Sequence, residues 1–281
     1  IGEFENIEFL PAKIEKILDG DTALLMTHSG NYTADMIFDS LVDQTDLDKI
    51  KAVPLIYQHF KGYFIDTDEP IDDGTITFMD FSIPQDNTMQ FMYVLPFSQH
   101  QCLVEHTYFS QHFVPEATYD QRLLQYCSSK FGADNWHIRE TEKGVIPMTA
   151  ASLKAPRGKR VASIGTKGGY TKASSGYTFY FVQKEAPKIV EQIKQGILPN
   201  KKPNRFNLYD ALLLRVLAAD ESLGHLLFSN LFKTSSPETV FTFLNEETSI
   251  MQDLFITSKS PSLPFLRSLI IEVGYQLRKN L

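Results

Sequence analysis

The chain contains very little cysteine: Cys102 and Cys127 are the two cysteines among its 281 residues. They form no CxxC pair, and neither has zinc-site spacing to any of the seven histidines. The sequence therefore offers neither a disulfide framework nor a metal centre. Free thiols are typical of a reducing compartment, so we expect a cytoplasmic protein that binds no metal.

Long apolar runs and a surplus of basic residues are also missing. No apolar stretch reaches the ~18 residues that span a bilayer, so any membrane contact would be peripheral. The formal net charge is -7, which argues against general binding of nucleic acid through its phosphate backbone. The printed residues also contain no GxGxxG turn of the kind that holds a dinucleotide pyrophosphate.

The residues that are present describe a folded chain whose first half is rich in strands. With 43% hydrophobic and 22% charged residues, the sequence can bury a sizeable core and is not typical of disorder. Asp19-Gly20 and Ser29-Gly30 separate short apolar runs, which predicts two hairpins. Residues 34–39 are predicted as a short buried strand.

Residues 54–110 are predicted to form a twisted antiparallel sheet, because aromatic and β-branched runs alternate there with turn clusters. The predicted strands are 54–64, 74–81, 89–95 and 101–108. A helix over 115–132 and a further strand over 134–149 follow. We expect a ligand tunnel on one face of this sheet.

The second half is predicted to be mainly helical. A glycine- and serine-rich loop over 161–178 precedes a helix over 179–195, whose apolar face is assigned to Phe179, Val182, Ala186 and Val190. Breaks at Ser, Pro and Asn divide the later helical region. Its predicted helices are 212–217, 223–232, 237–244 and 264–277. The fold class is α+β.

Several short blocks occur in an order that matches one known family. They are Gln58-His-Phe-Lys-Gly62, Phe78-Met-Asp-Phe81, Phe91-Met-Tyr-Val-Leu-Pro-Phe97, Leu103-Val-Glu-His-Thr107, Gly144-Val-Ile-Pro147 and the loop from Ile164 to Tyr177. Arg205-Phe206 and Pro264-Phe-Leu266 continue the match. The chain thus resembles the bacterial lycopene cyclases over nearly its whole length.

This resemblance implies an FAD-dependent fold of the lycopene cyclase and aromatic hydroxylase type. Under it the chain divides into a remnant of the FAD-binding domain (1–50), an antiparallel-sheet substrate domain (51–155), a flavin-contacting return loop and helix (156–200), and a helical carboxy-terminal region (201–281). The family begins with a Rossmann strand, GxGxxG turn and helix that hold the cofactor. None of these printed residues matches that segment, which we therefore expect to be absent from the chain.

The activity implied is acid-catalysed cyclisation of the ends of a linear, lycopene-like carotenoid, with a reduced FAD that is not consumed. This reaction needs a buried carboxylic acid, because burial keeps a carboxyl group protonated. Glu105 is the candidate acid, in an apolar strand at the position of the family's essential glutamate. A solvated strand glutamate, or one paired with Arg122 or Arg139, is the plainer interpretation.

Asp80 is a second candidate, which supports the acid or stabilises the carbocation; a simple residue at a strand end is the alternative. Four aromatic residues are expected to line the substrate tunnel, although aromatic residues at strand spacing often belong to a core. They are Phe81, Tyr93, Phe97 and Tyr108. The pair Glu246-Glu247 resembles a plant cyclase motif, but its place in the helical region favours a solvated helix face.

The return loop carries the predicted flavin contacts, since glycine permits close backbone approach to a cofactor. The residues are Gly165, Gly168, Gly169, Ser175, Gly176 and Tyr177. An ordinary flexible loop is the alternative interpretation. Thr166 stands where related monooxygenases carry an acidic residue, which weakens a monooxygenase assignment.

Two other functions remain open from sequence. One is an FAD-dependent reductase or monooxygenase acting on an isoprenoid or aromatic substrate, and the other is a truncated, non-catalytic module that binds an apolar ligand. Residues 265–279 form an amphipathic segment with Arg267, Arg278 and Lys279 near its ends. Such a helix is expected either to contact the inner face of the cell membrane, where a carotenoid dissolves, or to pack in the core.

Overall fold

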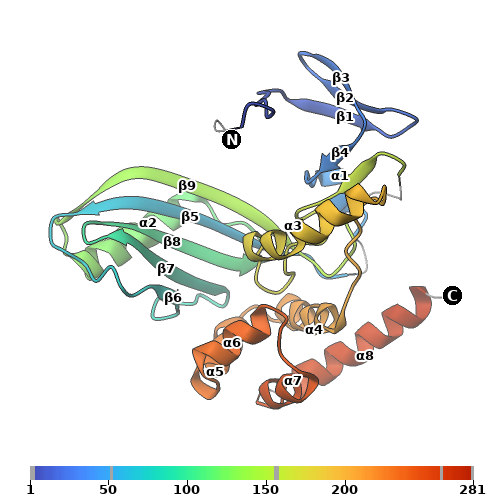
Figure 1. Cartoon of the computed structure of the whole chain (residues 1–281). Coiled ribbons are helices and arrows are strands. Elements are labelled where there is room, and N and C mark those ends of the chain that lie inside the picture. Colours follow the sequence, from blue (N-terminus) through green and yellow to red (C-terminus); the bar gives the residue numbers. More distant parts are fainter. Residues whose placement is uncertain (1–3, 51–52, 155–157, 260–261, 280–281) are drawn as a thin grey trace. The chain divides into compact units, whose positions relative to one another are not determined.

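The computed structural model describes residues 4–50, 53–154, 158–259 and 262–279 (Figure 1). Contacts along the chain define two compact units. The first unit comprises Ile1–Lys49, Ser152–Thr171 and Thr178–Lys202. The second comprises Ile50–Ala151, Lys172–Tyr177 and Pro203–Leu281. The four sections expected from the sequence remain a prediction of domain boundaries.

The first unit contains the two predicted hairpins. Strands β1 (Ile14–Leu18), β2 (Ala23–Thr27) and β3 (Gly30–Ala34) form an antiparallel sheet in that order. The short strand expected over 34–39 is instead β4 (Ile37–Asp39), which pairs in parallel with β10 (Val161–Ser163). The expectation of a buried strand was wrong for Phe38, which is 41% exposed, because side chains alternate between the two faces of a strand and the neighbours Ile37 and Asp39 take the inner face.

Helices α1 (Gln44–Asp48) and α3 (Phe179–Lys194) complete this unit. The apolar face assigned to α3 was wrong in part. Phe181 is its buried residue, whereas Phe179 is 78% and Val190 49% exposed. The predicted apolar face included Val182, one position away from the buried Phe181. More than one set of apolar residues in this helix has helical spacing, so the pattern does not identify the buried face.

The second unit is built on a five-stranded antiparallel sheet with the order β6-β7-β8-β5-β9. Its strands are β5 (Ile56–Thr67), β6 (Thr77–Asp80), β7 (Met89–Ser98), β8 (Gln101–Ser110) and β9 (Trp136–Met148). All five strands were predicted, within a few residues at each end. The central strand β5 pairs with both β8 and β9.

Helices pack on both faces of this sheet. Helix α2 (Glu116–Phe131) packs on one face, the α2 face, where Leu123 and Cys127 meet Met92 and Val104. The opposite face, here called the tail face, presents Phe91 and Phe109 to residues of α4 (Arg205–Ala219) and α5 (Leu223–Thr234). Both cysteines, Cys102 and Cys127, are free and buried on the α2 face.

The helical region begins earlier than predicted, and it contains one additional helix. Asn204 forms a capping box with Asn207, so that α4 starts at Arg205. Ser236 caps α6 (Pro237–Leu244), and Ser249 caps the unpredicted α7 (Ile250–Thr257). Helix α8 (Ser262–Lys279) ends the described chain.

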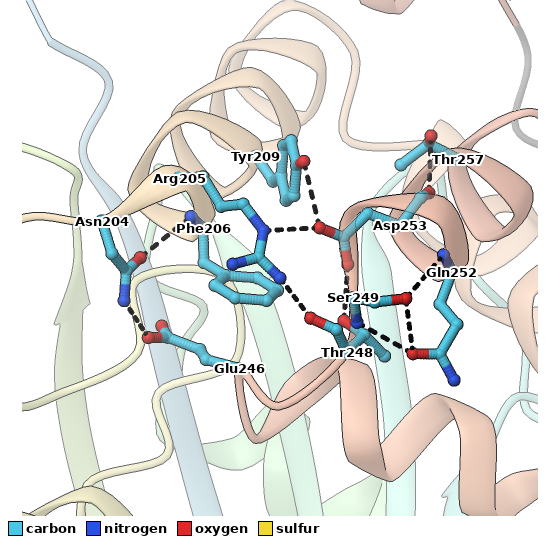
Figure 2. Close-up of polar contacts among 10 residues, drawn as sticks. All are labelled: Asn204, Arg205, Phe206, Tyr209, Glu246, Thr248, Ser249, Gln252, Asp253 and Thr257. Atoms are coloured by element: carbon cyan, nitrogen blue, oxygen red, sulfur yellow. Dashed lines mark hydrogen bonds and ion pairs between the residues drawn. The ribbon is translucent and has the colours of Figure 1, made fainter.

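Asp253 of α7 binds both helix α4 and Thr248, which lies in the loop before α7 (Figure 2). Its carboxylate accepts hydrogen bonds from Arg205 Nε at 2.7 Å, Tyr209 Oη at 3.2 Å and the Thr248 hydroxyl. The side chain is 1% exposed. A carboxylate so deeply buried is stable only when charged and polar donors surround it, as they do here.

Helix α8 packs against α4 with its polar side. Glu272 accepts a hydrogen bond from Arg215 Nε at 2.7 Å, and Ser268 is also buried. Large apolar side chains point outward instead, with Ile270 67% and Leu277 63% exposed. Within the described residues, no helix has both the length and the apolar character needed to cross a bilayer.

We predict that Asp253→Asn lowers the free energy of unfolding by about 2 kcal/mol or more, since the amide cannot accept all three donors and one end of it would face them with N–H groups. Urea denaturation measures the change. Asp73→Asn is the matched control, because Asp73 is exposed, and we expect it to change stability by less than ~0.5 kcal/mol. Equal stability of the two variants would contradict a structural role for Asp253.

Candidate functional site

A row of four residues crosses the tail face of the sheet, one from each of four neighbouring strands. Tyr93 of β7 pairs with Glu105 of β8, Glu105 pairs with Gly62 of β5, and Gly62 pairs with Glu142 of β9. Paired residues of adjacent strands point to the same side of a sheet. Two acidic side chains and a tyrosine therefore share one patch of this face.

Glu105 is half-buried and is bound to its neighbours. The Thr107 hydroxyl donates a hydrogen bond to Glu105 Oε1 at 2.5 Å. Burial raises the pKa of Glu105 to about 7, and the adjacent carboxyl group of Glu142 acts in the same direction, while the Thr107 hydrogen bond opposes it. A carboxyl group with this pKa keeps its proton in a substantial fraction of molecules at neutral pH.

Tyr93 connects this patch with the segment 172–177 of the second unit. The Tyr93 and Tyr177 side chains are hydrogen bonded, and burial holds the pKa of Tyr93 far above its usual range. Both hydroxyls are therefore neutral at neutral pH. The segment itself closes tightly, with Gly176 N–H donating to the Lys172 carbonyl at 2.9 Å.

Lys172 anchors the same segment from inside the unit. Its Nζ contacts Asp210 of α4 at 2.9 Å and Glu246 at 3.3 Å, and all three side chains are buried. The expectation that Glu246 lies on a solvated helix face was wrong. Helix α6 ends at Leu244, and Glu246 takes a left-handed backbone (φ 63°) that turns its carboxylate inward toward Lys172 and Asn204.

Gly176 lies against the sheet where a side chain would not fit. Its φ is 71°, and a Cβ atom there would lie 2.1 Å from Gln58 Oε1. Within the part of the chain that the structure describes, Gln58 Oε1 and the Ser175 hydroxyl are buried without a hydrogen-bond partner. Buried polar atoms without partners are costly, so these two fit a site where a polar ligand group binds.

The other predicted flavin contacts lie in the first unit. Gly165 and Gly169 adopt left-handed backbones, with φ of 54° and 75°. A Cβ atom on Gly168 would lie 2.5 Å from the Ser163 carbonyl oxygen. The internal geometry of the loop alone therefore requires glycine at these positions, and a role in flavin contact remains a prediction.

Asp80 and Tyr108 lie on the α2 face, away from Glu105. Asp80 pairs with Met92 and accepts a hydrogen bond from Tyr126 of α2 at 2.7 Å. Burial raises the pKa of Asp80, but hydrogen bonds from Ser82 and Tyr126 outweigh it, so the pKa is lowered and the group is a carboxylate at neutral pH. Tyr108 stacks on His59, with ring centroids 5.1 Å apart.

Phe81 and Phe97 flank the tail face in different ways. Phe81 packs edge-on against Phe91, with centroids 5.6 Å apart, and belongs to the core under α5. Phe97 is 58% exposed and stacks on Phe64, the residue two positions beyond Gly62 on β5. The structure thus brings together Glu105, Tyr93, Gly176 and Tyr177, but separates them from Asp80 and Tyr108.

A cavity of about 300 Å³ lies among helices α4 to α8 of the second unit. Its wall is mainly apolar and includes Leu213, Leu231, Phe243 and Phe265, with Asp210 as a polar corner. Glu105 is not among its lining residues. A tunnel beside Glu105 therefore remains a prediction. Among the residues described, no cluster of three or more His, Cys, Asp or Glu side chains has the arrangement of a metal site.

Comparison with known families assigns the chain to a class. The family model described as "Lycopene cyclase protein" matches residues 4–270. The chain belongs to this family. A comparison with curated proteins finds no match.

Solved structures show distant likenesses. A geranylgeranyl bacteriochlorophyll reductase-like protein from Thermoplasma acidophilum matches with 10% identity over 92% of this chain and 69% of its own, at a TM-score of 0.48. The tetracycline destructase Tet(51) has 15% identity, coverage of 88% and 68%, and a TM-score of 0.41. A flavin-dependent halogenase from Xanthomonas campestris has 12% identity, coverage of 86% and 47%, and a TM-score of 0.43. Likenesses of this degree do not define the activity of the chain.

Sequence reasoning missed Glu142, Gln58 and Lys172 as parts of the site. Glu142 stands in the run Arg139-Glu-Thr-Glu-Lys143, which has the composition of an exposed edge strand. Its position beside Glu105 follows from the register of β9 on β5. No hairpin turn joins these two strands, so the sequence offers no turn that would fix this register. Gln58 was noted within a family block, but nothing marked its side chain as buried.

We predict that Glu105→Gln changes how stability depends on pH. A raised carboxyl pKa stabilises the folded state below the unfolded-state pKa, and this contribution is lost as pH rises toward about 7. Wild type should therefore lose stability relative to the variant between pH 5 and pH 8, by about 2 kcal/mol. Urea denaturation at several pH values measures this. For the control Glu69→Gln, at an exposed position, the free energy of unfolding should depend on pH as it does in wild type. The same pH dependence in Glu105→Gln would contradict the raised pKa.

Proposed function

We propose that this protein is a flavin-dependent carotenoid cyclase that closes rings at the ends of a linear, lycopene-like polyene without net redox change. The observation that supports it most is the half-buried Glu105, whose pKa of about 7 suits a proton donor at neutral pH. Membership in the lycopene cyclase protein family points to the same substrate class.

Glu105 is proposed to protonate the terminal double bond. A C–H bond forms at the alkene as the O–H bond of the acid breaks, and the neighbouring double bond attacks the resulting carbocation to close the ring. The cation then loses a proton. An isolated alkene is a very weak base, so the acid has to be shielded from water and held in its protonated form.

Aromatic faces near Glu105 are proposed to stabilise the passing cation. Tyr93 is the cross-strand neighbour of Glu105, and the Phe64–Phe97 stack borders the same face. The negative face of an aromatic ring attracts a cation without reacting as a nucleophile would. Asp80 lies on the α2 face, so we propose that it acts indirectly, by holding Tyr126 and hence α2 against the sheet.

FAD is the proposed cofactor, with segment 164–177 as the part of this chain that contacts it. A reduced flavin would supply negative charge near the cation when bound. Gly176 leaves room for close approach, and Ser175 Oγ and Gln58 Oε1 are available to bind polar atoms. Gly165, Gly168, Gly169 and Tyr177 complete the proposed contact segment.

We predict that Glu105→Gln abolishes cyclisation in the flavin-containing protein, with a loss of at least about a hundredfold, because the amide matches the acid in size but cannot deliver a proton. Pigment analysis in cells that accumulate lycopene measures cyclic product, and flavin absorbance of the purified protein checks that cofactor and fold remain. Asp80→Asn should give a milder loss.

Three outcomes would each refute the assignment. Cyclic product at the wild-type rate from Glu105→Gln would exclude Glu105 as the acid. Wild-type protein that leaves lycopene linear while it oxidises a nicotinamide cofactor would instead support a reductase or monooxygenase. Purified protein that never retains flavin would support a non-catalytic apolar-ligand module.

Peripheral membrane contact through α7 and α8 is the second part of the proposal. Their outward sides carry large apolar residues, among them Met251 at 75% and Ile270 at 67% exposure. Arg267 and Arg278 are exposed residues of α8, where they could bind anionic headgroups. A lycopene-like substrate dissolves in the bilayer, so such contact would bring the enzyme to it.

We predict that wild-type protein floats with vesicles containing anionic lipid, and that the double variant Met251→Asp, Ile270→Asp remains in the soluble fraction. Burial of a charge in the acyl region opposes binding, while the α4-facing side of α8 is untouched. Ile76→Asp is the control, since Ile76 is 55% exposed but lies immediately before β6, outside α7 and α8. Wild-type protein that stays soluble would favour a protein-covered face.

A further inference from the structure

Glu105 has an acidic partner that the reaction scheme above does not use. Gly62 on the central strand β5 pairs with Glu105 on one side and with Glu142 on the other. Because glycine has no side chain, nothing from β5 separates the two carboxyl groups, and they are hydrogen bonded to each other. A Cβ atom on Gly62 would lie 3.1 Å from Glu142 Oε1, so this carboxyl group extends over the glycine.

A hydrogen bond between two carboxyl groups requires a proton on one of them. Two carboxylates are both acceptors and repel each other, so the pair titrates as a unit and releases its last proton reluctantly. Within the pair, Glu105 carries the proton. Burial raises the pKa of Glu105 to about 7. Burial also raises the pKa of Glu142, but the hydrogen bond that its carboxylate accepts from Glu105 partly offsets this rise.

Among the residues that the structure describes, no cation near the pair would let both groups ionise. Tyr93 of β7 faces Glu105 and is hydrogen bonded to Tyr177, and Glu140 of β9 acts on Glu142 by repulsion. Lys61 and Lys143 belong to the α2 face, where both contact Glu116. In the described part of the chain, none of the groups that shift the pKa of either glutamate is a lysine or an arginine.

We propose that Glu142 is a positioning residue for the cyclisation: through its hydrogen bond across Gly62, it keeps one proton on the pair and holds it on Glu105 beside the substrate. This inference rests on the proposed function. The pair then conserves its proton over a turnover. Glu105 gives its proton to the alkene carbon, the ring closes, and the proton that leaves the ring carbon returns to a carboxylate of the pair. Neither an oxidant nor a reductant is consumed.

Glu142→Gln tests the proposal in the flavin-containing protein. The amide carries no charge and can donate an N–H to Glu105, so it favours the ionised form of Glu105 and lowers its pKa. We expect the fall in cyclisation rate at high pH to begin about one pH unit lower than in wild type. The variant should be about tenfold slower at pH 8, yet close to the wild-type rate at pH 5.5. Lycopene in vesicles is the substrate.

Glu140→Gln is the matched control, because Glu140 lies on the same strand and is exposed, but makes no hydrogen bond to Glu105. Its pH profile should stay within about 0.3 units of wild type. A Glu142→Gln profile that coincides with wild type would overturn the proposal. An equal loss at every pH, without recovery at low pH, would indicate a structural role and would overturn it as well.

Infrared spectroscopy separates failure of this inference from failure of the proposed function. The band of a protonated carboxyl group that is missing in Glu105→Gln identifies Glu105, and its disappearance is followed with pH in wild type and in Glu142→Gln. We expect it to disappear at lower pH in Glu142→Gln, whether or not the protein cyclises lycopene. An unchanged titration would refute the pair even in an active cyclase, whereas a shifted titration in a protein that does not cyclise lycopene would refute the function alone.

Discussion

The absence of a side chain at Gly62 is the constraint on which the tail face depends. A Cβ atom there would lie 2.8 Å from Leu103 Cδ1 and 3.0 Å from Glu142 Cγ, so any larger residue would push the neighbouring side chains apart. Glycine usually weakens the middle of a strand. Here β5 is paired on both sides along most of its length, which secures its backbone and allows one position to remain without a side chain.

The two faces of the sheet differ in character: the α2 face is a packed core, and the tail face carries the acidic pair. On the α2 face, His59, His106, Tyr108 and Tyr119 interlock through ring contacts, and burial lowers the pKa of His59 to about 4 and of His106 to about 3. These histidines are neutral and part of a packed core. On the tail face the acidic pair meets the 172–177 segment, whose buried Lys172 is neutralised by Asp210 and Glu246. The charge of Lys172 is thus compensated inside the unit.

Local pattern was enough to predict the strands, the hairpins and most of the helices, because alternation and turn residues act over a few positions. The strand that carries Glu105 was found in this way, together with the family resemblance. The face on which Asp80 lies was not predictable. Phe78 and Met79 both pack toward the tail-face core at a bulge in β6, where Met79 has φ 54°. This extra residue reverses the alternation and turns Asp80 to the α2 face.

The same limit explains Glu142 and α8. A period of two says that Glu140 and Glu142 share a side of β9, but only the register on β5 decides that Glu142 meets Glu105. A helical period likewise gives α8 two sides without saying which is inside. The ion pair between Arg215 of α4 and Glu272 of α8 determines which side of α8 faces inward. It places the polar side of α8 against α4, so the apolar residues are on the outer side.

The outward position of these apolar residues follows from the inner ion pair rather than from weak packing. A helix whose polar side is fixed to the protein by a buried charge pair cannot turn its apolar side inward without breaking that pair, which is strongly unfavourable. The apolar side therefore stays exposed, on the unit that also holds Glu105, the proposed acid. The proposed proton donor requires exclusion of water, and the proposed substrate dissolves in lipid. Both requirements are met at a lipid surface, so an exposed apolar helix and a buried acid are consistent with one proposed function.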